Sequence, residues 1–199
     1  MGTIFWVVLV ANIMFSVIAL MEFVAFAKGS RFMFVCGLFN NVYWLGIGLY
    51  YGWHANIAIT CYFVIVNIVG FKIWHAGFKS LRRVWLLLVL FMAIALYTNL
   101  QVGFVNLAAK LNFINVGIYG VAYTLRLYKS KSRVAAALMF INRLIYLPTM
   151  ALANPILWGC VVRQSIMLIP YYALAFAPNS KLTNAIKNLQ ITIKTKTSK

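Results

Sequence analysis

The stretch RFMFVCGLFNNVYWLGIGLYYG, residues 31–52, decides the fold. It is apolar almost throughout and long enough to cross a membrane as a helix, which takes about 20 residues. Its centre nevertheless carries two adjacent amides, Asn40 and Asn41. A second apolar stretch, FINRLIY at residues 140–146, places Asn142 beside Arg143. Polar groups at such a depth are costly, so they indicate either a contact between helices or a binding site.

The composition gives the class of protein. Of the 199 residues, 64% are hydrophobic and only 10% are charged, and the mean hydropathy is +0.90. A soluble domain of this size has too little interior to bury that much apolar surface. The sequence therefore predicts an all-α integral membrane protein.

Charged and polar breaks divide the chain into seven apolar segments. We expect transmembrane helices over residues 3–27, 31–52, 54–77, 84–100, 105–127, 134–153 and 156–177. Thirteen of the 18 basic residues fall at alternate breaks, namely Lys28, Arg31, Lys79, Arg82, Arg83, Lys129, Lys131, Arg133 and the lysines of residues 181–199. By the positive-inside tendency the N-terminus lies outside and the C-terminus in the cytoplasm, which predicts a multi-pass protein of the inner (cytoplasmic) cell membrane.

The net charge of +17 is thus explained as an orientation signal, and no nucleic-acid partner is expected. The basic tail carries Leu182, Ile186, Leu189 and Ile193 at near-helical spacing. It is either a helix on the anionic inner leaflet of the bilayer or a partly disordered segment. A further partner, either a second copy of the chain or another membrane protein, stays open.

The two halves of the chain resemble each other. Laying the chain on itself brings Arg31 onto Arg133, Asn40 onto Asn142 and Trp44 onto Tyr146. Two three-helix units stay parallel when a single helix separates them. We therefore predict a 3+1+3 architecture of two parallel three-helix repeats, residues 1–83 and 105–177, joined by a linker helix at 84–104 and followed by a basic cytoplasmic tail at 178–199.

Polar residues of five segments share one depth near the middle of the bilayer, at roughly 12 to 18 Å from the outer ends. Aromatic residues lie beside them, and together they form the candidate substrate site. Its residues are Asn12, Asn40, Asn41, Tyr43, Trp44, Asn115, Tyr119, Asn142, Arg143, Tyr146, Arg163 and Gln164. An amide that faces lipid leaves its hydrogen bonds unmade, so these groups are expected to face one another or a wet cavity.

The chain contains a single carboxylate side chain, Glu22. We expect it near the cytoplasmic end of the first helix, away from the central residues, in an ion pair with Arg126 or Lys72. Arg143 and Arg163 then have no carboxylate at their own depth. Either water, carbonyl groups and amides solvate them, or an anionic or strongly polar substrate binds there.

Enzyme chemistry finds no support in the sequence. There is no pair of acids, no nucleophile with a base, and no metal-binding spacing, and His54 and His75 lie at opposite ends of one helix. We expect no catalytic residue, no cofactor and no metal. Candidate hinges for a moving protein are Pro148, Pro170, Gly46 and Gly70, because proline and glycine weaken a helix.

The stretch LYYGWHANIAITCYFVIVNIVGFKIW begins with Leu49 and Tyr50 and closes with Gly70, Phe71 and Trp74. In this pattern the chain resembles the PnuC-type vitamin transporters, which take up nicotinamide riboside and related nucleosides, and the wider group of SWEET-like sugar transporters. The resemblance implies the 3+1+3 fold and a substrate held at the cluster of amides and aromatic residues. The second half departs from the pattern, since it ends in PYYALAF.

The sequence thus predicts a transporter for a small polar solute, vitamin- or nucleoside-like, that works by alternating access and facilitated diffusion. With Glu22 away from the central residues, no proton relay is expected. The alternative is a membrane scaffold, or a subunit of a larger complex, that uses its polar residues only for helix packing. A transporter needs a water-accessible pocket, whereas a scaffold predicts a dry and mutually satisfied network.

Overall fold

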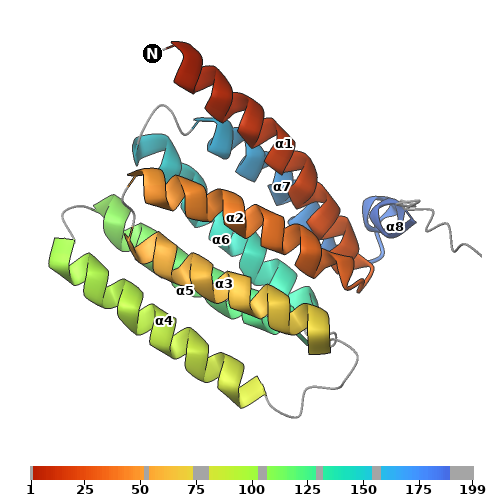
Figure 1. Ribbon diagram of the computed structural model, residues 1–199. Coiled ribbons are helices and arrows are strands. Elements are labelled where there is room, and N and C mark those ends of the chain that lie inside the picture. The colour runs from red at the N-terminus through yellow and green to blue at the C-terminus, as the bar shows by residue number, and fades with distance from the viewer. Residues whose placement is uncertain are drawn as a thin grey trace, which may run out of the picture.

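The computed structural model describes residues 2–51, 54–73, 81–102, 107–128, 132–153 and 158–188. These residues form eight helices and no strand, which confirms the expected all-helical class (Figure 1). The helices are α1 (Gly2–Ala27), α2 (Phe32–Tyr51), α3 (His54–Ile73), α4 (Leu81–Val102), α5 (Leu107–Leu125), α6 (Ser132–Ala153), α7 (Trp158–Phe176) and α8 (Lys181–Asn188).

Four helices of the described residues are long and apolar enough to cross a membrane, within Val10–Ala27, Phe32–Tyr50, His54–Lys72 and Arg82–Gln101. Two shorter apolar stretches, Phe113–Leu125 and Gln164–Phe176, lie in α5 and α7. Large apolar side chains such as Trp6, Val89 and Ile169 point outward and are more than half exposed. An exterior of this kind is stable against lipid tails, so the protein is a membrane-embedded multi-pass protein.

Where the structure describes them, the helix ends lie within a few residues of those expected from the sequence. The largest difference is at α4, which already includes Leu81 although its start was expected at 84, while the expected boundaries at 52, 77, 105 and 156 lie outside the described residues. Arg82 and Arg83 are exposed in the first turn of α4. A charged residue ends an apolar run but does not end a helix, so hydropathy alone places this boundary too late.

The connection from α1 to α2 follows from its sequence, AKGSRF. Gly29 has a φ of 64°, the left-handed conformation that commonly ends a helix. The Ser30 N–H then donates to the Ala25 carbonyl at 2.8 Å, and the Ser30 hydroxyl accepts from the Phe32 N–H at 3.3 Å, as a helix-capping serine does. This tight turn makes α1 and α2 direct neighbours.

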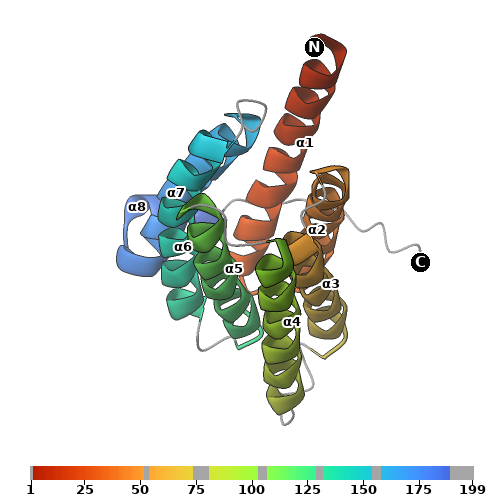
Figure 2. The ribbon, with the colours of Figure 1, turned by 90° about the vertical axis from the view of Figure 1, so that its left-hand side faces the viewer.

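The helices pack largely in chain order. α2 lies between α1 and α3, and α6 lies between α5 and α7, while contacts of α1 with α7 and of α3 with α5 join the two groups. α4 stands outside, against α3 and α5 (Figures 1 and 2). The short α8 packs on α7 and α1, with Ile186 buried and the Thr183 hydroxyl donating to a carbonyl of α7. The part of the tail over 181–188 is therefore a docked helix, and residues 189–199 lie outside the described chain.

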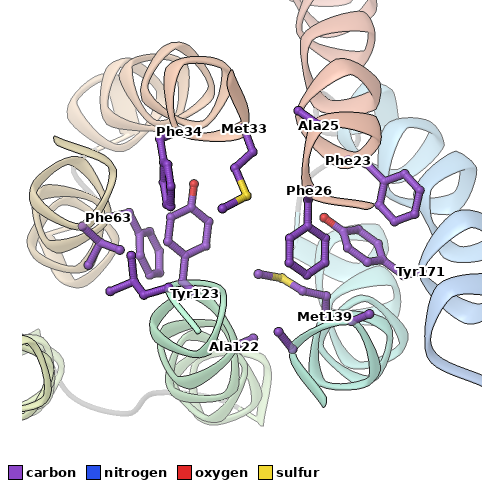
Figure 3. Packing of buried hydrophobic residues seen from close by; sticks show 14 of the residues in the cluster. Phe23, Ala25, Phe26, Met33, Phe34, Phe63, Ala122, Tyr123, Met139 and Tyr171 are labelled. Atoms are coloured by element: carbon purple, nitrogen blue, oxygen red, sulfur yellow. The ribbon is translucent and has the colours of Figure 1, made fainter. Parts of the chain in front are cut away.

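Aromatic residues form much of the core. Figure 3 shows Phe34, Phe63 and Tyr123 of α2, α3 and α5 packed together, with Phe26 and Tyr171 of α1 and α7 in a neighbouring group. Such pairs stabilise a core beyond the area that they bury. Each of these two aromatic groups contains residues from both halves of the chain, so the aromatic contacts hold the two halves together.

The candidate hinges have different surroundings. A Cβ atom on Gly70 would lie 2.4 Å from the Phe34 ring, so close packing explains this glycine, whereas Gly46 has open space around it. Pro148 and Pro170 lie inside α6 and α7. Each proline leaves the carbonyl four residues earlier without its helical partner. A role for these residues as hinges stays a prediction.

Candidate functional site

A cavity of about 80 Å³ lies between the two groups of helices. Five helices contribute to its wall, α2 and α3 from one group and α5, α6 and α7 from the other. The lining residues are Asn40, Asn41, Trp44, Asn56, Ile59, Thr60, Phe63, Asn115, Val116, Tyr119, Asn142, Arg143, Tyr146 and Gln164. This volume has room for several water molecules, and the wall is polar enough to hold them.

Most of the residues predicted from the sequence meet at this cavity. Those in its wall are Asn40, Asn41, Trp44, Asn115, Tyr119, Asn142, Arg143, Tyr146 and Gln164. Asn12 and Tyr43 do not line the cavity. The Tyr43 hydroxyl donates to Asn12 Oδ1 at 2.5 Å instead, and this bond joins α1 to α2. Arg163 belongs to α7, but its side chain lies outside the described part of the protein. Substrate binding by any of these residues stays a prediction.

Asn142 is fixed by Asn115. Its amide donates to Asn115 Oδ1 at 2.7 Å and to the Asn115 backbone carbonyl at 2.8 Å, which joins α6 to α5. On the other side, Trp44 of α2 meets Tyr146 of α6 edge to face, with ring centroids 6.2 Å apart. Asn40 and Asn142, and likewise Trp44 and Tyr146, take equivalent positions when the chain is laid on itself. The members of both pairs therefore meet at one site.

Arg143 is buried in the wall, with 7% of its surface exposed. Its guanidinium lies over the Tyr171 ring, 4.9 Å from the centroid, an attractive cation–π contact. Its Nε has no hydrogen-bond partner among the described residues. The side-chain carbonyl Oε1 of the equally buried Gln164 also lacks a partner within the described chain. One unpaired donor and one unpaired acceptor thus belong to the wall of the same cavity.

A second polar cluster surrounds Glu22. Its carboxylate pairs with Arg126 at 2.5 Å, and both side chains are almost fully buried. The Tyr123 hydroxyl donates to Glu22 Oε1 at 3.2 Å and accepts from Asn67 and Asn41 at 3.1 and 3.4 Å. The faces of the Arg126 guanidinium meet the rings of Phe26 and Tyr123. We call Glu22, Arg126, Tyr123 and Asn67 the Glu22 cluster.

The position of the Glu22 cluster corrects one expectation. Glu22 was expected away from the central residues, but Asn40 of the cavity wall donates to Glu22 Oε2 at 3.4 Å, and Asn41 donates to Tyr123. Of the two expected partners Arg126 is confirmed, whereas Lys72 is exposed. A carboxylate can reach toward residues that lie up to a turn away along the helix, and depth counted at Cα ignores this reach.

The sequence analysis missed several residues of the site. Asn56 and Thr60 line the cavity from α3, where the Thr60 hydroxyl donates to the Asn56 carbonyl. Their spacing of four residues puts them on one face of the helix, and that signal could have been found. Tyr123 and Asn67 carried no signal of their own, because a tyrosine or a single asparagine in an apolar helix is common.

The wall combines flat aromatic rings with amides and one fixed positive charge. Trp44, Phe63 and Tyr146 offer ring edges and faces, and the amides offer donors and acceptors within the same small volume. Such rings and amides suit a planar solute with polar groups, but the cavity of about 80 Å³ is smaller than ligand pockets of about 300 Å³ or more, so it has to widen before a ring can enter. It contains no nucleophile with a neighbouring base among the described residues.

Comparison with protein-family models, with curated proteins and with solved structures finds no match for the chain.

Proposed function

We propose that this protein is a transporter that facilitates the passage of a small polar solute, vitamin- or nucleoside-like, across the membrane. In this proposal α1–α3 and α5–α7 are two parallel repeats, α4 is the linker, and the N-terminus lies outside. The exchange of access between the two sides takes place around the central cavity.

One observation carries the proposal, namely the cavity with buried but unpaired polar atoms. A scaffold would use its polar residues to pack helices. The Glu22 cluster largely fits that description, since Glu22, Tyr123 and Asn67 bond one another and Arg126 has Glu22 as its counter-charge, although Arg126 Nε and Nη2 also lack hydrogen-bond partners in the described chain. The cavity does not fit it. Arg143 Nε and Gln164 Oε1 are buried without partners in the described chain, which is costly unless water or a solute meets them.

The helix contacts suggest how the cavity could open. Helices of both groups form the wall of the cavity. A rotation of one group against the other would therefore change the side of the membrane to which the cavity opens. Glu22 of α1 pairs with Arg126, directly after the end of α5, and this contact ties the two groups together. Pro148 and Pro170 weaken α6 and α7 at places where a bend could occur.

Downhill transport remains our expectation, although Glu22 lies closer to the cavity than the sequence indicated. Its carboxylate is held by Arg126 and Tyr123 and is thus part of the packing. Facilitated diffusion predicts that uptake follows the gradient of the solute and does not change when a pH gradient is imposed across the membrane.

The test is uptake of labelled vitamins, nucleosides and sugars into vesicles that contain the purified protein. Asn142→Leu should abolish uptake of the compound that the parent carries, since Asn142 lies in the wall. Ile141→Leu is the matched control, because its neighbour Ile141 is 41% exposed on the outer face of the same helix. No uptake above empty vesicles, or equal uptake by Asn142→Leu and the parent, would contradict the proposal.

A further inference from the structure

We propose that the central cavity selects solutes that carry a carboxylate on a planar ring, and that Arg143 is the residue that recognises the carboxylate. This inference rests on the proposed function, since it names the charge of the solute that the cavity takes.

The charges of the chain lead to this inference. Two arginine side chains are shown to be buried, Arg126 and Arg143. The chain contains one carboxylate side chain, Glu22, and it pairs with Arg126. A guanidinium stays charged in a protein, and a buried charge needs a counter-charge or good hydrogen bonds. No carboxylate side chain is left for Arg143, and its Nε has no hydrogen-bond partner among the described residues, so a bound solute can supply both the counter-charge and the hydrogen bond.

The geometry of Arg143 leaves its edge available. Tyr171 covers one face of the guanidinium, and a cation–π contact uses the face and not the N–H groups. The N–H groups point outward in the plane, where two of them match the two oxygens of a carboxylate. Nε is one of these donors, and it is unpaired within the described chain. One described guanidinium in the wall matches the single charge of a carboxylate better than the two charges of a phosphate monoester.

The other residues of the wall indicate which further chemical groups the solute carries. The amide of Asn142 is held by Asn115, so it forms a fixed part of the wall. Gln164 Oε1 is an unpaired acceptor and calls for an N–H or O–H group on the solute. The rings of Trp44 and Tyr146 border the same space and suit a flat ring. The expected solute is a compact aromatic or heteroaromatic carboxylate with a hydrogen-bond donor.

The experiment compares probes that differ only in charge. Binding of nicotinate and nicotinamide, and of benzoate and benzamide, is titrated on the purified protein by tryptophan fluorescence and by thermal shift. The parent should bind each carboxylate more tightly than its carboxamide by roughly tenfold to a hundredfold, the range for a hydrogen bond to a charged group. In Arg143→Gln this preference should disappear, whereas Arg143→Lys, which keeps the charge, should retain part of it.

Arg82→Gln is the matched control, because it removes one positive charge from the exposed first turn of α4. It should keep the full preference. If Arg143→Gln fails to fold, as a melting curve would show, Arg143→Lys still decides, because a preference identical to that of the parent would contradict the two-oxygen contact with Arg143.

The outcomes separate this inference from the proposed function. Equal binding of carboxylate and carboxamide by the parent, or a preference that Arg143→Gln leaves intact, overturns the inference. If the protein then carries a neutral solute and Asn142→Leu abolishes this uptake, the transporter proposal stands without it. If no probe binds and no compound is carried, both fall.

Discussion

Glu22 and Arg126 lie 104 residues apart in the sequence and form a buried ion pair, with Arg126 Nη1 2.5 Å from Glu22 Oε1. The pair joins α1 to Arg126, the residue that directly follows α5, and α1 and α5 are the first helices of the two proposed repeats. Since Glu22 is the only carboxylate side chain of the protein, no other residue can replace it as the partner of Arg126. The contact is thus one of those that hold the two halves of the chain together, beside the contacts of α1 with α7 and of α3 with α5.

Glu22→Gln should lower the stability of the protein strongly. It removes the counter-charge of Arg126 and leaves a buried cation, a change that costs about 3 to 5 kcal/mol in other buried pairs. The measurement is thermal unfolding in detergent, followed by fluorescence. The double variant Glu22→Gln/Arg126→Met removes both charges and should recover much of the loss.

A double variant no more stable than Glu22→Gln would show that the effect is not electrostatic. Arg83→Gln serves as the control for a change of charge alone, because Arg83 is exposed in the first turn of α4. It should alter the midpoint of unfolding little.

Tyr123→Phe should destabilise the Glu22 cluster more mildly. The hydroxyl connects Glu22, Asn41 and Asn67, and its removal leaves buried amides with fewer partners at a cost of about 1 to 3 kcal/mol. Tyr97→Phe on α4 is the control, since Tyr97 is 63% exposed. Equal unfolding midpoints for the two variants would show that the Tyr123 hydroxyl contributes nothing to stability.

The course of the helices could be predicted from the sequence because lipid imposes a simple rule. Each apolar run had to be a helix, and the breaks between runs were marked by charges or by a capping motif such as Gly29 and Ser30. The placement of α4 outside the others, against α3 and α5, was not predicted as a packing arrangement. Packing depends on the shapes of side chains on particular faces, and hydropathy contains no such information.

The level of the site residues along each helix could be predicted from the sequence, but the direction in which their side chains point could not. Counting along each helix put Asn12 and Asn142 at one level, yet only Asn142 faces the cavity, while Asn12 bonds to Tyr43. The rotation of each helix about its axis decides this, and a helix that is apolar all round gives little sign of its rotation. For the same reason the reach of Glu22 toward Asn40 could not be read from the sequence.

Gly70→Ala should destabilise the contact between α2 and α3. The added Cβ atom would lie 2.4 Å from the Phe34 ring, and overpacking of this kind costs about 1 to 3 kcal/mol. Gly46→Ala is the matched control, because nothing lies within 4 Å of the added atom there. It should be neutral or raise stability by up to about 1 kcal/mol through better helix propensity.

The double variant Gly70→Ala/Phe34→Leu separates packing from bending. If close packing is the reason for Gly70, the smaller side chain should restore part of the stability. If transport is lost in Gly70→Ala while its unfolding midpoint equals that of the parent, the glycine serves as a hinge and the packing explanation is wrong.

The most direct test of the central claim is the water accessibility of the cavity. In a variant with all native cysteines replaced, Gln164→Cys is treated with a water-soluble, charged thiol reagent, and Ile166→Cys, which is 48% exposed on the outer face of α7, is the control. A thiol reacts as the thiolate and therefore needs water around it. We predict fast modification of Gln164→Cys and none of Ile166→Cys, with nicotinate slowing the reaction. If neither cysteine reacts in the folded protein, the cavity is dry, and the protein is a packed scaffold instead of a transporter.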